Sequence, residues 1–341
     1  MSAGHTHRAA VLGAGSWGTA LAIHLSRVGH DVTLWGRDER LIDEMQARQA
    51  NPTYLPDIVF PSSLRPVALL DEALAGTRHV IVAVPSHGLR TVVRAASPFI
   101  PNNAVLVSAT KGIEAESLQR MSEVIQDETG GAHPVVVLSG PSFAAEVARH
   151  LPTALVAASG SAAAVASVQD AFRGPSFRLY GSDDTVGVEI GAALKNIIAI
   201  AAGVTESMHL GHNAMAALIT RGLAETSRLA CAMGGRRESL AGLSGLGDLV
   251  LTCTGSLSRN RHVGIELGRG RPLEDILAGM RMVAEGVRTT TAALALGRKY
   301  DVELPIAAQI AEVLAGRVTP RAAVGNLMLR PQRGEHDAVV S

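Results

Sequence analysis

Aromatic side chains are scarce in this sequence and make up 3% of its 341 residues. Few aromatic platforms are therefore available for stacking on nucleic-acid bases. The formal net charge is zero, so the chain also lacks the excess of basic residues that nucleic acids and acidic membranes attract. We expect no nucleic-acid partner.

Cysteine and long apolar runs are also rare. Cys231 and Cys253 are the two cysteines, and their spacing matches no metal-binding or redox motif, so we expect free thiols and no bound metal. No stretch approaches the ~18 uninterrupted apolar residues of a membrane span. Residues 1–8 lack the apolar core of a secretory signal. We expect no membrane span and a cytoplasmic location.

Short apolar runs recur through the first half of the chain, with helix-like spacers between them. Their lack of polar alternation indicates strands that are covered on both faces. The runs are Ala9–Leu12, Val32–Trp35, Val80–Val84, Val105–Val107, Val135–Leu138 and Ala154–Ala157. The alternation of strand and helix predicts an α/β Rossmann-type domain with a mostly parallel sheet, which we place at residues 1–190.

A glycine-rich turn, Gly13-Ala-Gly-Ser-Trp-Gly18, follows the first predicted strand. Gly13 permits a tight turn, Gly15 lets the backbone approach a pyrophosphate, and Gly18 lets helix and strand pack closely. The amino terminus of the next helix then offers N–H groups to the phosphates. The motif predicts dinucleotide binding; the alternative is a plain glycine turn in an unliganded βαβ unit.

Arg37 follows the second predicted strand, near the position where an acidic residue would bind the ribose 2′-hydroxyl. An arginine there suits a 2′-phosphate better, which favours NADPH, while the adjacent Asp38 keeps NADH open. A solvated surface arginine is the alternative reading. We therefore expect NAD(H) or NADP(H) as cofactor, with the preference undecided.

Three further strands end in segments that are rich in glycine or polar residues. These are Pro85-Ser-His87, Ser108-Ala-Thr-Lys-Gly112 and Ser139-Gly-Pro-Ser-Phe143. The carboxyl ends of parallel strands share one edge, where ligands bind, so Lys111 should face the nicotinamide end of the cofactor. Gly140 and Ser142 offer hydrogen-bond donors there. An ordinary loop lysine and a plain Gly-Pro turn are the alternatives, and His87 has no clear role.

The second half has helical periodicity, and we expect a helical substrate-binding domain over residues 191–341. Lys195 is a lone charge in the apolar run from Gly191 to Gly203. Its helical neighbours three and four positions away carry no carboxylate. Such a lysine has a lowered pKa, gains a partner from elsewhere in the fold, or extends its charged end into water.

Two polar segments stand out in this half. Asp248 follows the glycine-rich Leu243-Ser-Gly-Leu-Gly247. Further on, Ser258 is predicted to cap a helix whose first turn holds Arg259 and Asn260. Helix amides, a guanidinium and an amide side chain together suit a phosphate. The alternative is an arginine that pairs with a carboxylate of a neighbouring helix.

The chain resembles the bacterial NAD(P)-dependent glycerol-3-phosphate dehydrogenases in several blocks, which occur in order between about Arg8 and Leu329. The blocks are Gly13–Gly18, Ser108–Gly112, Leu138–Phe143, Ala193–Ile197, Gly245–Asp248 and Ser258–Asn260. The resemblance implies reversible reduction of dihydroxyacetone phosphate to sn-glycerol 3-phosphate for phospholipid synthesis. It also implies a phosphorylated small-molecule substrate and a homodimer.

The resemblance further implies a role for individual residues. Lys195 would be the proton acceptor during oxidation, with Lys111 and Asp248 beside it. Substrate contacts would come from Lys111, Gly140, Ser142, Lys195, Asp248, Ser258, Arg259 and Asn260. Cofactor contacts would come from Gly13, Gly15, Ser16, Trp17, Gly18, Arg37, Lys111, Ala144, Arg259, Val283 and Glu285. Asn196 and Thr252 lie in matching blocks without a defined role.

Two other functions fit parts of the pattern. A β-hydroxyacid dehydrogenase also combines a dinucleotide domain, a helical domain and a lysine, but its carboxylate substrate needs a cationic clamp of its own, and one clear anion site is present. A regulatory protein that senses nicotinamide nucleotides would bind the cofactor without turnover. The two placed lysines argue against that reading.

Overall fold

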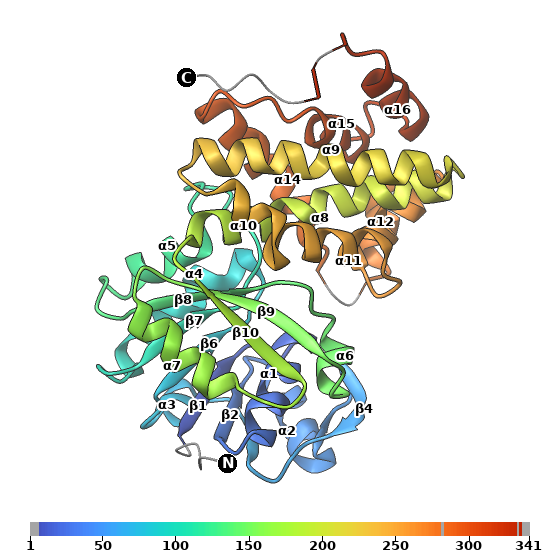
Figure 1. Cartoon of the computed structure of the whole chain (residues 1–341). Coiled ribbons are helices and arrows are strands. Elements are labelled where there is room, and N and C mark those ends of the chain that lie inside the picture. Colours follow the sequence, from blue (N-terminus) through green and yellow to red (C-terminus); the bar gives the residue numbers. More distant parts are fainter. Residues whose placement is uncertain (1–6, 281–282, 333, 336–341) are drawn as a thin grey trace.

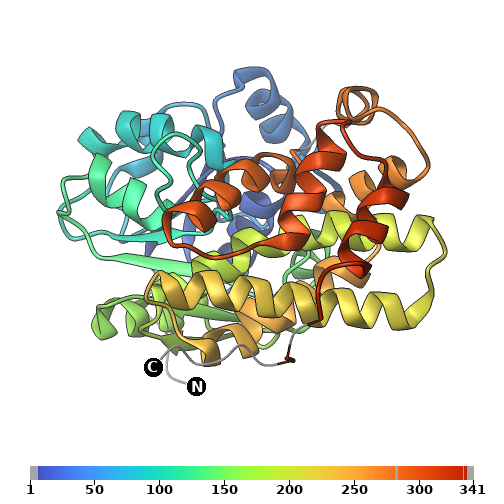
Figure 2. The ribbon, with the colours of Figure 1, turned by 90° about the horizontal axis from the view of Figure 1, so that it is seen from above.

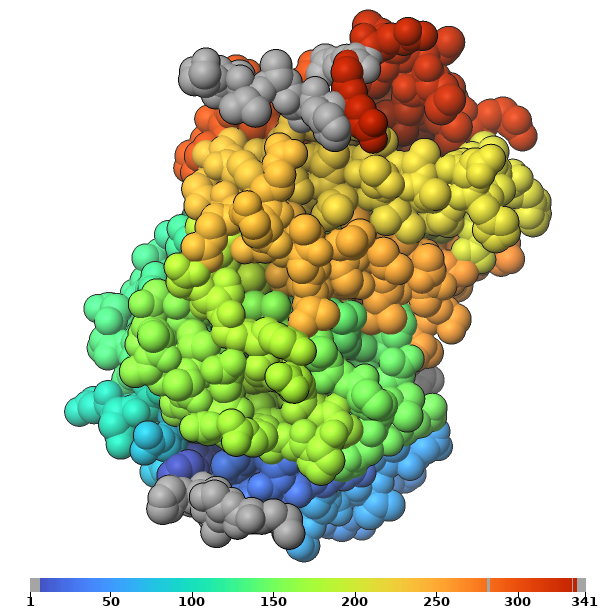
Figure 3. All heavy atoms as spheres, viewed as in Figure 1, coloured from blue at the N-terminus to red at the C-terminus, as the bar shows by residue number. Residues whose placement is uncertain are grey.

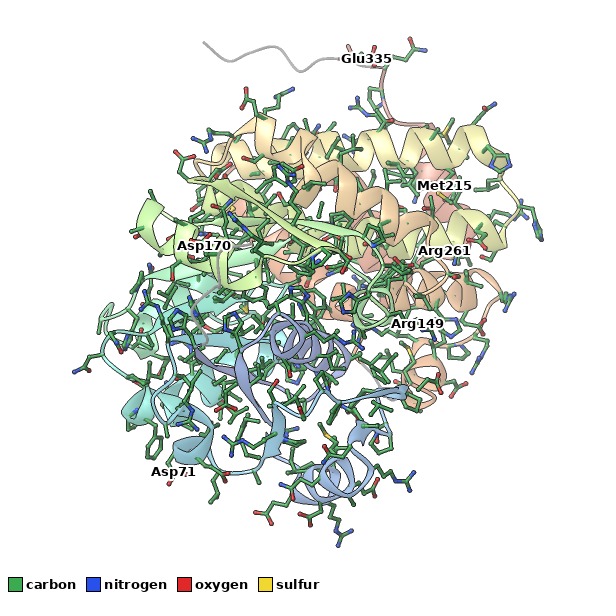
Figure 4. The ribbon with its side chains drawn as sticks, turned by 60° about the horizontal axis from the view of Figure 1, so that its bottom comes forward. Asp71, Arg149, Asp170, Met215, Arg261 and Glu335 are labelled. Atoms are coloured by element: carbon green, nitrogen blue, oxygen red, sulfur yellow. The ribbon has the colours of Figure 1, made fainter. Side chains whose placement is uncertain are left out.

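The computed structural model describes residues 7–280, 283–332 and 334–335. Its residues 7–182 form a sheet with flanking helices, here called the sheet part, and residues 185–335 form the helical part. Figure 1 shows the helical part stacked above the sheet part. In Figure 4, Asp71 of the sheet part and Met215 of the helical part lie at opposite ends of the molecule.

The central sheet has the strand order β10-β9-β8-β7-β6-β1-β2-β5. Neighbouring strands pair in parallel except for β8 and β9, which are antiparallel. The strands are β1 (Arg8–Leu12), β2 (Asp31–Trp35), β5 (Leu64–Val67), β6 (His79–Val82), β7 (Val105–Ser108), β8 (Val135–Ser139), β9 (Thr153–Ala158) and β10 (Phe177–Ser182). The mostly parallel sheet is confirmed, and the two edge strands β5 and β10 are additions to the six predicted strands. A separate antiparallel pair joins β3 (Ala50–Asn51) and β4 (Leu55–Val59).

Helices cover both faces of this sheet, which explains the continuous apolar runs of its central strands. One apolar cluster packs β1, β7 and β8 against α1 and α7, and a second packs the other face against α3, α4 and α5. The helices of the sheet part are α1 (Ser16–Arg27), α2 (Glu39–Arg48), α3 (Leu70–Leu74), α4 (Ser86–Ala96), α5 (Met121–Glu128), α6 (Ala144–Ala148) and α7 (Ala162–Phe172), with a 3₁₀ turn at Ser97–Phe99. The predicted Rossmann-type architecture is therefore correct.

The helical part is arranged around α8 (Thr185–Ser207), whose residues from Gly187 to Thr205 are all buried. Around it lie α9 (Gly211–Ala232), α10 (Arg237–Ala241), a π-helical turn (Leu243–Gly247), α11 (Asp248–Thr254), α12 (Arg259–Gly268), α13 (Leu273–Ala278), α14 (Glu285–Lys299), α15 (Pro305–Leu314) and α16 (Pro320–Met328). Figure 2, which looks down on this part, shows the long α9 running across it. The predicted division at 190/191 falls inside α8, because this helix begins at Thr185.

In length and composition, α8 is apolar enough to cross a membrane, but 94% of its most apolar window is buried inside the protein. Its apolar character is that of a core helix. Against it, α12 packs unusually closely at Gly203 and Gly264. A Cβ atom on Gly264 would overlap the carbonyl oxygen of Ile200, and one on Gly203 would overlap that of Arg261. Glycine is therefore required at this crossing, which brings the centre of α12 against the last third of α8.

Candidate active site

A carboxylate and two lysines meet where the sheet part contacts the helical part. Lys195 lies in the middle of α8, Asp248 is the first residue of α11, and Lys111 follows β7. Lys195 Nζ hydrogen-bonds to Asp248 Oδ1, and Lys111 Nζ lies 2.6 Å from Asp248 Oδ2. The side chain of Asp248 is 1% exposed and that of Lys195 is 8% exposed. Asp248 is therefore the partner that Lys195 does not find within its own helix. The ammonium group of Lys111 binds the same carboxylate.

The helix turns before and after Asp248 hold its carboxylate in place. The segment before Asp248 is a π-helical turn, an irregularity that often occurs at functional sites. One turn after Asp248, the Thr252 hydroxyl donates to the Asp248 carbonyl oxygen at 2.6 Å and accepts a hydrogen bond from Lys195 Nζ at 2.8 Å. Thr252 therefore holds the Lys195 ammonium on the side of Asp248. The sequence places Thr252 in a matching block but gives no sign of this contact.

Burial and the neighbouring charges set the protonation of the cluster. Burial lowers the pKa of Lys195 to about 7; the attraction of Asp248 opposes this shift, and the positive charge of Lys111 adds to it. Burial alone would raise the pKa of Asp248, but Lys111 and Lys195 together hold it below its ordinary value. Loss of a proton from Lys195 leaves one ammonium and one carboxylate, a balanced pair. The cluster can therefore exchange one proton near neutral pH.

The polar segments at the ends of β7 and β8 come together, as the sheet topology predicts. Lys111 Nζ donates to the Gly140 carbonyl oxygen at 3.1 Å, and the Ser142 hydroxyl donates to the same oxygen at 3.0 Å. Both segments face Asp248 of the helical part. This arrangement puts Gly140 and Ser142 beside the cluster that Lys111, Lys195 and Asp248 form.

The start of α12 has the features of an anion site. Ser258 caps the helix by accepting a hydrogen bond from the Arg261 N–H at 3.2 Å, as predicted. Arg259 in the first turn is exposed to solvent, yet enough protein surrounds its guanidinium for burial to lower its pKa, with Glu285 opposing the shift. Among the described residues, no carboxylate forms an ion pair with Arg259. An anion would satisfy both this guanidinium and the helix terminus.

Asn260 is engaged differently from the expectation of a free amide facing a phosphate. Its Nδ2 donates to Asn196 Oδ1 at 2.9 Å, and its Oδ1 accepts from the Gly286 N–H at 2.9 Å. The side chain thus ties α12 to α8 and to the first turn of α14. One N–H of its amide is left for a ligand.

The glycine-rich turn joins β1 to α1 and fits the pyrophosphate of a dinucleotide. Gly13 has φ of +121°, and a Cβ there would lie 2.6 Å from the Ala83 carbonyl oxygen. Nothing lies within 4 Å of a Cβ on Gly15, and the first turn of α1 carries no acidic side chain. The backbone at Gly15 therefore leaves room for an anion at the amino terminus of α1.

The remaining predicted cofactor residues belong to α1, to the start of α6, to the segment after β2 and to the segment before α14. Trp17 packs on the apolar cluster under α1, together with Ala144 at the start of α6. Arg37 is exposed after β2. Val283 is half-buried before α14; its neighbours 281 and 282 lie outside the described residues.

Glu285 forms a direct bridge between the two parts of the chain. Its carboxylate accepts hydrogen bonds from the Ser86 N–H at 3.0 Å and the Ser86 hydroxyl at 2.6 Å, at the amino terminus of α4. His87 follows, and burial lowers its pKa, as do the charges of Arg288 and Arg37, while Glu285 opposes the shift. Sequence reasoning missed the contact with Ser86, although it singled out both segments.

Comparisons with known proteins agree with this geometry. Family models described as the N-terminus and the C-terminus of NAD-dependent glycerol-3-phosphate dehydrogenase match residues 8–165 and 184–325. A glycerol-3-phosphate dehydrogenase (NAD(P)+) of Xanthomonas campestris is 46% identical over 331 residues, 97% of each chain. One of Thioalkalivibrio sulfidiphilus is 53% identical over 268 residues, 79% of this chain and 80% of the relative. The crystal structure of the Coxiella burnetii glycerol-3-phosphate dehydrogenase matches with a TM-score of 0.92 at 41% identity, covering 95% of this chain and 99% of that one.

Proposed function

The chain belongs to the NAD-dependent glycerol-3-phosphate dehydrogenase family, and from this membership we propose that it reduces dihydroxyacetone phosphate reversibly to sn-glycerol 3-phosphate. It is an oxidoreductase of a family that uses NAD(H) or NADP(H), and the family supplies glycerophospholipid synthesis. The observation that carries the assignment of chemistry is the buried Lys195, whose pKa of about 7 suits proton exchange with an alcohol at neutral pH.

In this proposal, Lys195 transfers the proton. During reduction, its ammonium donates a proton to the carbonyl oxygen of the substrate while the carbonyl carbon gains a hydride; during oxidation, the neutral amine removes the hydroxyl proton. A nicotinamide cofactor held at the glycine-rich turn would supply or accept that hydride. Asp248 holds the amine in place, and Thr252 restricts its direction.

Lys111 would stabilise the negative charge that develops on the reacting oxygen. Its ammonium lies 2.6 Å from the carboxylate that also binds Lys195, so both positive groups would lie near the reacting oxygen of a bound substrate. It also helps to keep the pKa of Lys195 low. Gly140 and Ser142 would line the same pocket.

Arg259 and the first amides of α12, with Ser258 and Asn260 beside them, would hold the phosphate. The phosphate is the fixed point that orients the carbonyl carbon toward the hydride. Residues 13–18, Arg37, Ala144, Val283 and Glu285 would contact the cofactor. The family resemblance supports a homodimer in the cytoplasm, and we propose the division between two domains just before α8.

The test is the absorbance of the reduced nicotinamide after dihydroxyacetone phosphate is added, in parallel with NADH and NADPH. We expect dihydroxyacetone phosphate to oxidise NADH, NADPH or both. In the reverse direction, 3-hydroxyisobutyrate and 6-phosphogluconate should not reduce the oxidised cofactor. An Arg37→Ala variant should lower kcat/KM for NADPH more than for NADH if Arg37 binds the 2′-phosphate. No turnover with either cofactor, despite measured cofactor binding, would overturn the proposed function.

A further inference from the structure

Glu189 is a further carboxylate that joins the two parts of the chain, away from the reacting groups. It lies on α8, the helix that also carries Lys195, and is 4% exposed. Its Oε2 accepts from Arg120 Nη1 at 2.6 Å and from the Ser122 hydroxyl at 2.7 Å, and its Oε1 accepts from the Ser122 N–H at 2.8 Å. Three hydrogen bonds therefore fix one point of α8 to the start of α5.

Arg120 and Ser122 stand at the end of the segment that carries Lys111. Residues 109–120 connect β7 to α5 and fold back on themselves, because Ile113 pairs with Arg120 in an antiparallel bridge. Ile113 follows Lys111 by two residues. A contact that positions Arg120 therefore also positions the chain next to Lys111.

The other side of this segment is fixed within the sheet part. Arg90 on α4 donates to both carboxylate oxygens of Glu114, Nε at 2.9 Å and Nη2 at 2.7 Å. Its Nη1 also lies 2.6 Å from Glu128 Oε1 on α5. Since Arg90 and Glu128 belong to the sheet part, these contacts make the segment rigid but cannot set its distance from α8. Ile113 packs in the apolar cluster around α8, and Glu189 adds the buried polar contacts that connect the segment to this helix.

The spacing matters because Lys111 and Lys195 bind opposite oxygens of Asp248. A small shift of residues 109–120 relative to α8 would lengthen the contact between Lys111 and Asp248. The same shift would weaken the repulsion that Lys111 exerts on Lys195. Electrostatic stabilisation depends on donors that are held in place before the reaction.

We propose that Glu189 is a positioning residue that ties the Lys111 segment to α8 and so sets the spacing of the two lysines around Asp248. The proposal rests on the proposed function, in which these lysines serve the reacting oxygen. Arg120 and Glu123 are the charged side chains that the described residues place at this contact. A buried ion pair alone is weak evidence of a stabilising role, so the test must separate positioning from stability.

Glu189→Gln is the test variant, because the amide keeps the size of the side chain and can still accept from the Ser122 N–H. Glu123→Gln is the matched control: Glu123 also binds Arg120, at 2.7 Å, but it lies on α5 and does not reach α8. For each purified protein, kcat and kcat/KM for glycerol 3-phosphate oxidation are measured against pH, with cofactor affinity and thermal stability.

We expect Glu189→Gln to lower kcat about tenfold with cofactor affinity unchanged. The acid limb of the profile, where kcat/KM rises with pH, should move to higher pH. Glu123→Gln should keep the native profile. A Glu189→Gln protein that is less stable but has the native kcat and limb would overturn the proposal. If this variant does not fold, Ser122→Ala, which removes one hydroxyl contact, should move the limb in the same direction, and a native profile would overturn the proposal. A native protein without glycerol 3-phosphate turnover would instead refute the proposed function.

Discussion

Removal of the Lys111 charge should move the pH dependence of glycerol 3-phosphate oxidation. In this direction Lys195 must be neutral, so kcat/KM should rise with pH up to the pKa of Lys195, about 7, and then level off. Lys111 lowers this pKa through the repulsion between two ammonium groups on one carboxylate. A Lys111→Met variant should therefore have its acid limb at higher pH.

The size of the shift follows from Coulomb's law. A unit charge about 4 Å away contributes about 4 kcal/mol at an effective dielectric constant of about 20. At 1.36 kcal/mol for each pKa unit, this energy corresponds to at most about 3 units. The negative charge of Asp248 lies between the two ammonium groups and offsets part of their repulsion, so we expect a shift of roughly 1 to 2 pH units. The native pKa of Lys195 should accordingly become about 8 to 9 in the variant.

The assay is the initial rate of nicotinamide reduction at subsaturating glycerol 3-phosphate between about pH 5.5 and 10. Each profile is scaled to its own plateau, because loss of Lys111 also lowers the rate itself. Lys111→Arg is the control: it keeps the positive charge and should keep the limb near pH 7. Coincident limbs for the native protein and Lys111→Met would refute the electrostatic coupling of the two lysines.

Three other predictions concern separate parts of the molecule. Arg259→Leu should raise KM for dihydroxyacetone phosphate at least tenfold but leave the weak reduction of unphosphorylated dihydroxyacetone nearly unchanged; equal losses for both substrates would show that Arg259 does not bind the phosphate. Gly264→Ala should lower the free energy of unfolding by about 1–3 kcal/mol, since its methyl group must separate α12 from α8, and a native urea midpoint would contradict that packing. Burial lowers the pKa of both His24 and His79 to about 4 from 6.5, so the unfolded state binds more protons between these values and stability should fall as pH drops from 6.5 to 4, by up to roughly 3 kcal/mol for each histidine. Urea midpoints measured across this range check the slope, and a His79→Gln variant should show a shallower one.

The sequence predicts the rim of the sheet better than its edges. Lys111 and Gly140 could be placed together because the carboxyl ends of parallel strands form one rim of the sheet, whatever the order of the strands. The edge strand β5 contains Arg65 and Pro66, and its pattern departs from the continuous apolar runs of the central strands. Proline is tolerated at a sheet edge, where one side of the strand needs no partner. Such a strand has little signal in the sequence.

Partners from distant segments are the part of the site that the sequence leaves open. The apolar run around Lys195 shows that this charge needs a partner or a lowered pKa, and the fold supplies both through Asp248, 53 residues away. Asn260 remains a predicted phosphate ligand, but the sequence does not show that its amide also contacts Asn196 on α8 and Gly286 on α14. Glu189 has no distinguishing pattern, since only the folded chain brings Arg120 to it.

The space-filling view in Figure 3 shows the helical part resting on the sheet part, and the cluster of Lys111, Lys195 and Asp248 contains residues of both. Proton transfer in the proposed reaction depends on one side chain of the core helix α8, that of Lys195. Substitution of Lys195 by methionine removes the proton donor and keeps the length of the side chain. The decisive measurement is the single-turnover rate of NADH or NADPH oxidation by dihydroxyacetone phosphate in Lys195→Met, with the cofactor Kd measured on the same protein. We predict a rate lower by about 10²–10⁴-fold, the usual contribution of a general acid, at an unchanged Kd; a rate within a few-fold of the native protein would contradict the assignment of Lys195 as the proton donor.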